Sequence, residues 1–237
     1  MKKNFKLFCF GFGQVAKKFV ENLINDDFNF DLVTTNTSKT EVKKFKNKKH
    51  KSFFFKDGKF DRNLIRELIL SNKVLISISP KNQEDITLHN FNKIFKKNKF
   101  DWVTYLSATS VYGDQKGKWV NEKIKPNPTS QRGKDRLKAE TQWLEFFKKF
   151  NLPVQIFRLS GIYSTKNNAI NRLKKRALKI VKKKNHFFSR IHVDDNARIL
   201  TISVKKIQGG QIFNISDNYP CSNIEIAKYA ANLIKVK

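Results

Sequence analysis

The feature that most constrains the fold is a glycine-containing turn close to the start of the chain. Residues 7–10 form a short apolar run typical of a buried strand, and Gly11 and Gly13 follow it directly. After the glycines, apolar residues return at helical spacing, at Val15, Ala16, Phe19, Val20 and Leu23. The pattern predicts a strand that turns sharply at two glycines into an amphipathic helix.

Such a turn is a physical device for holding a phosphate. Gly11 permits the tight turn, Gly13 lets the backbone approach a pyrophosphate, and the small Ala16 lets the helix pack on the strand. The free N–H groups at the start of the helix face the anion. The bare motif also occurs in ordinary strand–turn–helix units, but the strand before it and the helix after it favour a dinucleotide site. We therefore predict cofactor contacts from Gly11, Gly13, Gln14 and Val15.

The rest of the chain alternates between strand-like and helix-like segments. The expected strands are residues 28–36, 52–55, 74–79, 102–107 and 154–159. The expected helices are residues 61–70, 84–97 and 132–150, and residues 109–131 read as a loop. This alternation predicts an α/β fold with a doubly wound parallel sheet.

The pattern loosens after Gly161. We expect helices at residues 170–181, 193–204 and 223–234 and one strand at 211–215, which is too little for an independent core. The expected organisation is therefore a core of residues 1–160 and a small α/β cap of residues 161–237 on the substrate side. Both belong to one compact unit. Because residue 237 directly follows the last expected helix, we expect the substrate side to be open or completed by a partner, a second copy of the chain included.

Composition narrows the functional classes. The net charge of +29 would suit a nucleic-acid binder, but the lysines are spread over nearly every expected helix and loop, so we expect no specific nucleic-acid site. Cys9 and Cys221 are the only cysteines, and Cys9 lies in a buried strand, which favours a reducing, cytoplasmic location. No apolar run reaches the roughly 20 residues of a membrane helix, and Gly11 and Gly13 interrupt the one stretch that imitates an export signal.

In open parallel sheets, ligands bind beyond the carboxyl ends of the strands. The loops after the expected strands should therefore meet at one cleft, and we add Thr35, Asn36, Ser79, Pro80 and Ser107 to the predicted cofactor site. A site for NAD usually has a carboxylate at the end of the second strand, which accepts hydrogen bonds from the ribose hydroxyls. This chain has no carboxylate there. This slightly favours NADP over NAD; the alternative is that these residues only make a turn.

Five ordered motifs carry a family resemblance. They are residues 105–113 (YLSATSVYG), 128–140 (PTSQRGKDRLKAE), 157–163 (FRLSGIY), 191–197 (IHVDDNA) and 213–217 (FNISD). Together they resemble the extended short-chain dehydrogenase/reductase family, in its NAD-dependent epimerase/dehydratase group. The resemblance implies a Rossmann fold, a bound nicotinamide dinucleotide, NAD(P), and a small substrate such as a nucleotide sugar.

The chain departs from this family at its working trio, a Ser or Thr followed by Tyr-x-x-x-Lys. The corresponding positions are Ala108, Arg132 and Arg136. Arginine stays protonated, with a pKa above about 12, so Arg132 does not exchange a proton as tyrosine does. The sequence therefore resembles the atypical branch of the family, in which the trio is missing.

Two interpretations follow from these residues, and the net charge alone leaves a third, a polyanion-binding or nucleic-acid-binding protein. In the first the protein is an enzyme, with Tyr112, Ser107, Thr109 or Ser110 as substitute proton donors. Arg132 and Arg136, one helical turn apart, would clamp an anionic substrate, and Arg136 would also reach the cofactor ribose. In the second the protein binds the cofactor without turnover, as a sensor or scaffold. Under either of the first two interpretations, the alternative for Tyr112 is a core aromatic that braces the loop, and the alternative for the two arginines is a solvated helix face.

Three further groups deserve a prediction. Arg158 and Arg190 are candidates to bind a phosphate of the substrate. His192 with Asp194 and Asp195 imitates a metal site, but a carboxylate that caps the following helix explains the motif better, and we expect no metal.

Overall fold

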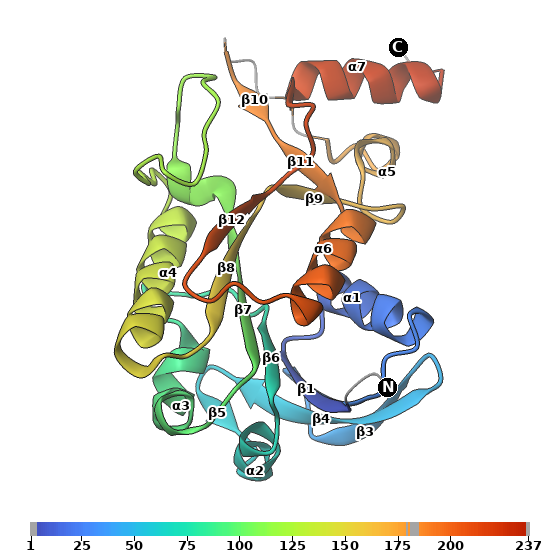
Figure 1. Cartoon of the computed structure of the whole chain (residues 1–237). Helices are drawn as coiled ribbons and strands as arrows, with labels where there is room; N and C mark the ends of the chain where they lie inside the picture. Colours follow the sequence, from blue (N-terminus) through green and yellow to red (C-terminus); the bar gives the residue numbers. More distant parts are fainter. Residues whose placement is uncertain (1–3, 179, 181–184, 236–237) are drawn as a thin grey trace.

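A nine-stranded, mostly parallel sheet forms the centre of the protein (Figure 1). The computed structural model describes residues 4–178, 180 and 185–235. Along the sheet the order is β12-β8-β7-β6-β1-β2-β4-β3, and β5 pairs with β4. The strands are β1 (Phe5–Phe10), β2 (Phe30–Asn36), β3 (Glu41–Phe45), β4 (Lys48–Lys56), β5 (Lys59–Phe60), β6 (Lys73–Ile76), β7 (Trp102–Ala108), β8 (Val154–Leu159) and β12 (Ile212–Ile215). Only the β3–β4 and β4–β5 pairs in this described sheet are antiparallel, and this arrangement confirms the predicted α/β class.

Helices cover both faces of the sheet (Figure 1). One face carries α1 (Gln14–Asn25) and α6 (Val193–Lys205), which pack against each other. The opposite face carries α2 (Asn63–Ile69), α3 (Ile86–Lys97) and α4 (Gln131–Phe150). The result is a doubly wound, Rossmann-like sandwich, as predicted.

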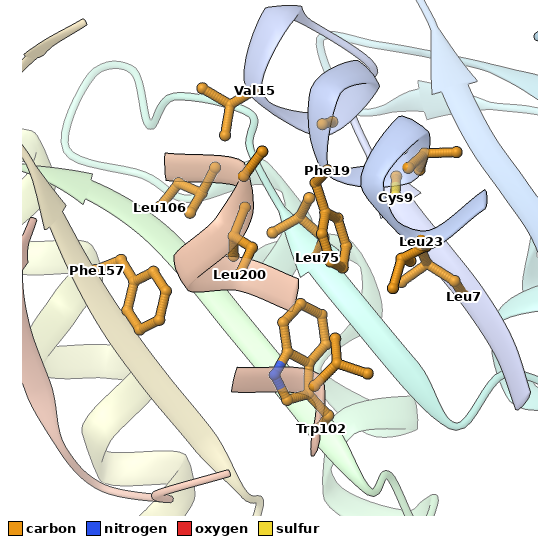
Figure 2. Packing of buried hydrophobic residues seen from close by; sticks show 14 of the residues in the cluster. Leu7, Cys9, Val15, Phe19, Leu23, Leu75, Trp102, Leu106, Phe157 and Leu200 are labelled. Carbon is orange, nitrogen blue, oxygen red and sulfur yellow. The ribbon is translucent and has the colours of Figure 1, made fainter. Parts of the chain in front are cut away.

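The core between the sheet and the α1/α6 layer shows why these segments fold together (Figure 2). Phe19 and Leu23 of α1 and Leu200 of α6 are buried against sheet residues such as Leu7, Leu75 and Trp102. The rings of Phe19 and Trp102 lie 5.8 Å apart between centroids, and Trp102 Nε1 donates to Ser203 Oγ of α6 at 3.1 Å. Helix α6 is therefore part of the main core.

The segment after β2 differs from expectation. A polar stretch and a short strand at 52–55 were predicted, whereas the structure has a hairpin of β3 and β4. Its inner side carries Phe45 and His50, whose rings lie 5.2 and 5.5 Å from that of Phe12 in the glycine turn. Burial lowers the pKa of His50. The many lysines among residues 43–51 make the inward-facing positions of the hairpin hard to recognise in the sequence. In the structure, the hairpin packs against Phe12 of the glycine turn.

Residues beyond 160 divide between the sheet and a smaller upper part (Figure 1). The smaller part holds β9 (Gly161–Tyr163), α5 (Ala169–Lys174), β10 (Phe187–Phe188), β11 (Arg190–His192), β13 (Cys221–Ser222) and α7 (Asn223–Leu233). Since β12 pairs with β8 and α6 packs on α1, the expected division at 160 does not follow the core. The helix expected at 170–181 is the shorter α5, and residues 179 and 181 of that range lie outside the described residues.

None of the helices in the described part of the chain combines the length and apolar character that a membrane crossing requires.

Candidate functional site

The turn between β1 and α1 requires glycine at its first position. Gly11 has φ +81°, and a Cβ there would lie 2.8 Å from Ser77 Oγ. Its N–H donates to Thr35 Oγ1 at 2.8 Å, while Ser77 Oγ donates to the carbonyl of Phe10 at 3.0 Å. Three neighbouring parallel strands thus hold the turn, since Phe10 ends β1, Thr35 lies on β2 and Ser77 follows β6.

Gly13 is a glycine for a different reason. Its φ of −80° suits any residue, and a Cβ there would meet no atom within 4 Å. It is the N-cap of α1, yet no side chain caps this end and no acidic residue lies in the first turn. The N–H groups at the start of α1, from Gln14 and Val15 onward, and the positive end of the helix dipole therefore adjoin open space. This cradle, which a side chain would fill, fits a pyrophosphate.

At the end of β2, the predicted cofactor residues make a turn. Thr35 is buried and accepts from Gly11. Asn36 Oδ1 accepts the N–H groups of Ser38 and Lys39 at 2.8 and 3.1 Å, and its Nδ2 donates to Ser52 Oγ at 2.8 Å. The amide group of Asn36 is therefore engaged within the protein, as the turn interpretation expects.

Arg136 joins two other predicted residues. From α4 its Nη2 donates to Ser79 Oγ and its Nη1 to the carbonyl of Leu106, both at 2.9 Å. Ser79 and Pro80 follow β6, and Leu106 lies near the end of β7. Arg136 thus lies at the carboxyl edge of the sheet, on the same side as the glycine turn.

Arg158 does not lie where a substrate phosphate could reach it. Only 2% of it is exposed, and it pairs with Glu140 of α4, with 2.7 Å between Nη2 and Oε2. Burial lowers the pKa of Arg158, but the hydrogen bonds and charge of Glu140 outweigh this and raise it. Ser107 is also buried and donates to Glu140 Oε1 at 2.5 Å. Arg158 and Ser107, predicted as substrate and proton-transfer groups, are both held inside the fold.

Tyr112 belongs to the same buried network. Its hydroxyl accepts from Arg158 Nη1 and donates to Asn214 Oδ1, both at 2.8 Å. The guanidinium lies 4.8 Å from the centre of its ring. The structure therefore favours the bracing role for Tyr112. Glu140 was missed by the sequence reading, although an arginine inside the apolar strand 154–159 is a signal for a buried partner.

A cleft of about 1120 Å³ opens beside this network. Its walls come from the loop after β7 and from the part of the chain beyond 160. Thr109, Ser110 and Arg190 line it, and their roles as proton donors and phosphate ligand stay predictions. Arg190 is partly engaged, since its Nη1 donates to the carbonyl of Phe188 at 3.0 Å and its Nη2 to Asn223 Oδ1 at 3.2 Å.

Arg132 is exposed and is not among the residues that line the cleft. Arg136, one helical turn further along α4, does not line the cleft either and is held by Ser79 and the carbonyl of Leu106, so the clamp of Arg132 with Arg136 stays a prediction. The buried face of α4 carries Gly133, Asp135, Ala139, Glu140 and Trp143, and the exposed Arg132 is not part of it.

The His192 motif is a helix cap, but not with the expected group. His192 itself is the N-cap of α6, and its Nδ1 accepts the N–H of Asp194 at 3.3 Å. Asp194 pairs with Lys18 of α1 at 3.2 Å, which ties the two helices together. In the described part of the chain no group of three or more His, Cys, Asp or Glu side chains is arranged to hold a metal ion.

Comparison with known proteins identifies the family. A family model described as NAD dependent epimerase/dehydratase matches residues 85–216. A curated relative, dTDP-D-glucose 4,6-dehydratase of Dictyostelium discoideum, is 27% identical over an alignment of 162 residues, and the match covers 60% of this chain. These residues make up 36% of the relative, so the chain matches about a third of that protein's length.

Solved structures share the fold over nearly the whole chain. A functionally unknown conserved protein from Silicibacter pomeroyi has a TM-score of 0.82 at 28% identity, over 98% of this chain and 79% of that one. UDP-glucuronic acid 4-epimerase from Bacillus cereus, in complex with NAD, has 0.80 at 17%, over 98% and 85%. dTDP-glucose 4,6-dehydratase from Bacillus anthracis, also with NAD, has 0.76 at 16%, over 98% and 82%. Since the family model covers more than half of the sequence, the chain belongs to the NAD-dependent epimerase/dehydratase family.

Proposed function

We propose that the protein binds a nicotinamide dinucleotide at the glycine turn and acts on a small anionic substrate, of the sugar-nucleotide kind, in the cleft that Thr109, Ser110 and Arg190 line. The observation that carries the proposal is the open cradle at Gly13, where an uncapped helix start adjoins space that any side chain would occupy. The UDP-glucuronic acid 4-epimerase and the dTDP-glucose 4,6-dehydratase described above hold NAD in the same fold, and UDP-N-acetylglucosamine 4-epimerase from Bacillus cereus shares this fold.

When bound, the nicotinamide ring supplies the hydride chemistry. The protein's contribution is binding and orientation. Backbone N–H groups at Gly13, Gln14 and Val15 hold the pyrophosphate, and Gly11 shapes the turn. Arg136, already hydrogen-bonded to Ser79, provides a fixed cation at the carboxyl edge of the sheet.

Thr109 and Ser110 are the proposed proton-donating groups. Both line the cleft, directly after the end of β7. Tyr112 and Ser107 are less suited to this role because the hydroxyls of both are engaged in the buried Glu140–Arg158 network. Arg190 lines the same cleft and is the proposed phosphate ligand.

A second candidate function is cofactor binding without turnover. It is favoured by Ala108, Arg132 and Arg136 at the three trio positions and by the engagement of Tyr112 and Ser107. A panel of sugar nucleotides and carbonyl compounds, followed at the absorbance of the reduced nicotinamide, separates the two functions. Binding without any conversion favours the sensor or scaffold.

The slight preference for NADP over NAD stays part of the proposal. It is supported by the absence of a carboxylate among Thr35, Asn36, Thr37 and Ser38 and by Lys39, which follows. A carboxylate there would repel a 2′-phosphate, whereas this stretch tolerates one.

Calorimetric titration of NAD(H) and NADP(H) against the wild type and Gly13→Asp tests the proposal. Aspartate fits the backbone at Gly13 and is a favourable N-cap, so the variant should fold with a melting temperature equal to or above the wild type. Its carboxylate would occupy the cradle and repel the pyrophosphate, and binding should fall at least about a hundredfold.

Asn25→Asp is the matched control, because it adds the same charge at the exposed far end of α1. It should bind like the wild type. If Gly13→Asp binds either cofactor as tightly as the control does, or if the wild type binds neither, the glycine turn is not the cofactor site.

A further inference from the structure

Two exposed aromatic side chains line the cleft. Trp119 is 74% exposed and Phe187 is 50% exposed, and both line it. Trp119 comes from the loop after β7 and Phe187 from β10. Single exposed apolar residues are common on protein surfaces, but two aromatic rings from separate walls of one cleft form a binding feature.

Gly117 brings these two walls together. Its φ is +81°, and a Cβ there would lie 2.9 Å from the carbonyl oxygen of Asn185 and 3.4 Å from Phe187 Cδ2. Only glycine lets the loop approach so closely with this backbone conformation. Trp119 follows two residues later, within about 7 Å along the chain. The approach therefore brings the segment that carries Trp119 close to Phe187.

Cations accompany the aromatic pair. Lys118 immediately precedes Trp119, and Arg172 and Arg190 line the same cleft, where they outnumber the two lining aspartates, Asp114 and Asp217. At about 1120 Å³ the cleft exceeds the usual range of about 300–1000 Å³ for small-molecule sites. A ligand that matches these features has a planar ring at one end and phosphates nearby.

We propose that Trp119 and Phe187 hold the planar base of a nucleotide substrate, with its phosphates toward Lys118, Arg172 and Arg190. The inference rests on the proposed function and deepens it, because it assigns the base-recognition residues of the cleft. Base–aromatic stacking accepts any base, since every base has a π face. The pair therefore selects for the presence of a base, and the cations select for charge.

The tryptophan content makes the test direct. The chain has three tryptophans, and Trp102 and Trp143 are 0% exposed. A ligand that contacts the cleft changes the fluorescence of Trp119 without touching the other two. Titration with UDP should quench this fluorescence saturably, while pyrophosphate and glucose 1-phosphate, which lack a base, should not quench it at the same concentrations.

Calorimetry on variants completes the test. Trp119→Leu and Phe187→Ala should each bind UDP about 5- to 150-fold more weakly, the range of one lost stacking contact. Tyr229→Ala is the matched control, because Tyr229 is 65% exposed on α7 and does not line the cleft. It should bind UDP like the wild type.

Quenching by pyrophosphate equal to that by UDP, or wild-type affinity of both aromatic variants, overturns the inference. Titration of NAD in parallel separates the two proposals. If NAD binds and is lost in Gly13→Asp while UDP leaves Trp119 unaffected, only the base site is wrong. If UDP binds through Trp119 and NAD does not bind, the base site stands and the cofactor proposal fails.

Discussion

At the scale of single residues, the buried ion pair of Glu140 and Arg158 determines which hydroxyl groups of the site are available for proton transfer. Glu140 and Arg158 are 1% and 2% exposed, and the pair also engages Ser107 and Tyr112. Two hydroxyls that could serve as proton donors are thereby used for structure. Removing one partner of such a pair is costly, since the other charge stays buried without compensation.

Glu140→Gln should therefore lower the free energy of unfolding by about 3–5 kcal/mol, measured by urea denaturation. The size of the side chain is kept, so the loss reports the uncompensated Arg158 charge. Glu145→Gln on the same helix is the control: its partner Lys149 is 3.4 Å away and both are exposed, so a loss of no more than about 1 kcal/mol is expected. Equal losses of unfolding free energy in the two variants would show that the buried pair contributes no more to stability than an exposed one.

Among the elements, β12 adds the last strand beside β8, and α6 covers one face of the sheet. Strand β12 pairs in parallel with β8, and α6 buries Ala197, Leu200 and Val204 against the sheet and α1. Both come from the part of the chain beyond 160. By contrast, α7 buries only Ala227 and Ala230 in the described residues.

A chain of residues 1–160 should therefore fail to unfold cooperatively, because Trp102 and Phe157 lose their cover from α6 and β12. Thermal unfolding followed by near-UV circular dichroism measures this. A chain of residues 1–218 removes β13 and α7 and should keep a cooperative transition at a lower temperature. A sharp transition in the 1–160 chain would instead support the boundary expected from the sequence.

At the scale of the whole molecule, the dominant feature is the large positive net charge. The net charge of +29 is spread over the chain, and most of the ion pairs in the described residues lie at the surface, where they add little to stability. With 49 lysine and arginine residues against 20 aspartate and glutamate residues, most of the positive charge has no carboxylate to offset it, so the protein attracts any polyanion. Self-association of the chain stays a prediction.

The protein should bind duplex DNA without sequence preference, and the affinity should drop about tenfold or more between 50 and 200 mM salt. Fluorescence anisotropy with two unrelated DNA sequences measures both properties. A strong preference for one sequence, or an affinity that salt leaves unchanged, would contradict a diffuse electrostatic interaction and indicate a dedicated nucleic-acid site.

The elements that were predicted well depend on local patterns. The glycine turn, the amphipathic α1 and the apolar strands β7 and β8 follow from spacing within a few residues. The hairpin of β3 and β4 was missed because its inward residues, Phe45 and His50, are separated by lysines and gain their meaning only from contact with Phe12. The length of α5 was overestimated, because the basic helical pattern of the sequence continues past Lys174, where the helix ends.

The sequence by itself determined the family, the sheet class and the position of the glycine turn, because these depend on neighbours in the chain and on ordered motifs. Only the tertiary structure decided the roles of the arginines. Arg132, Arg136 and Arg158 are alike in sequence, yet one is exposed, one spans Ser79 and Leu106, and one is buried against Glu140. The reason is physical: a charged group takes its function from the partners that surround it, and those partners come from distant parts of the chain.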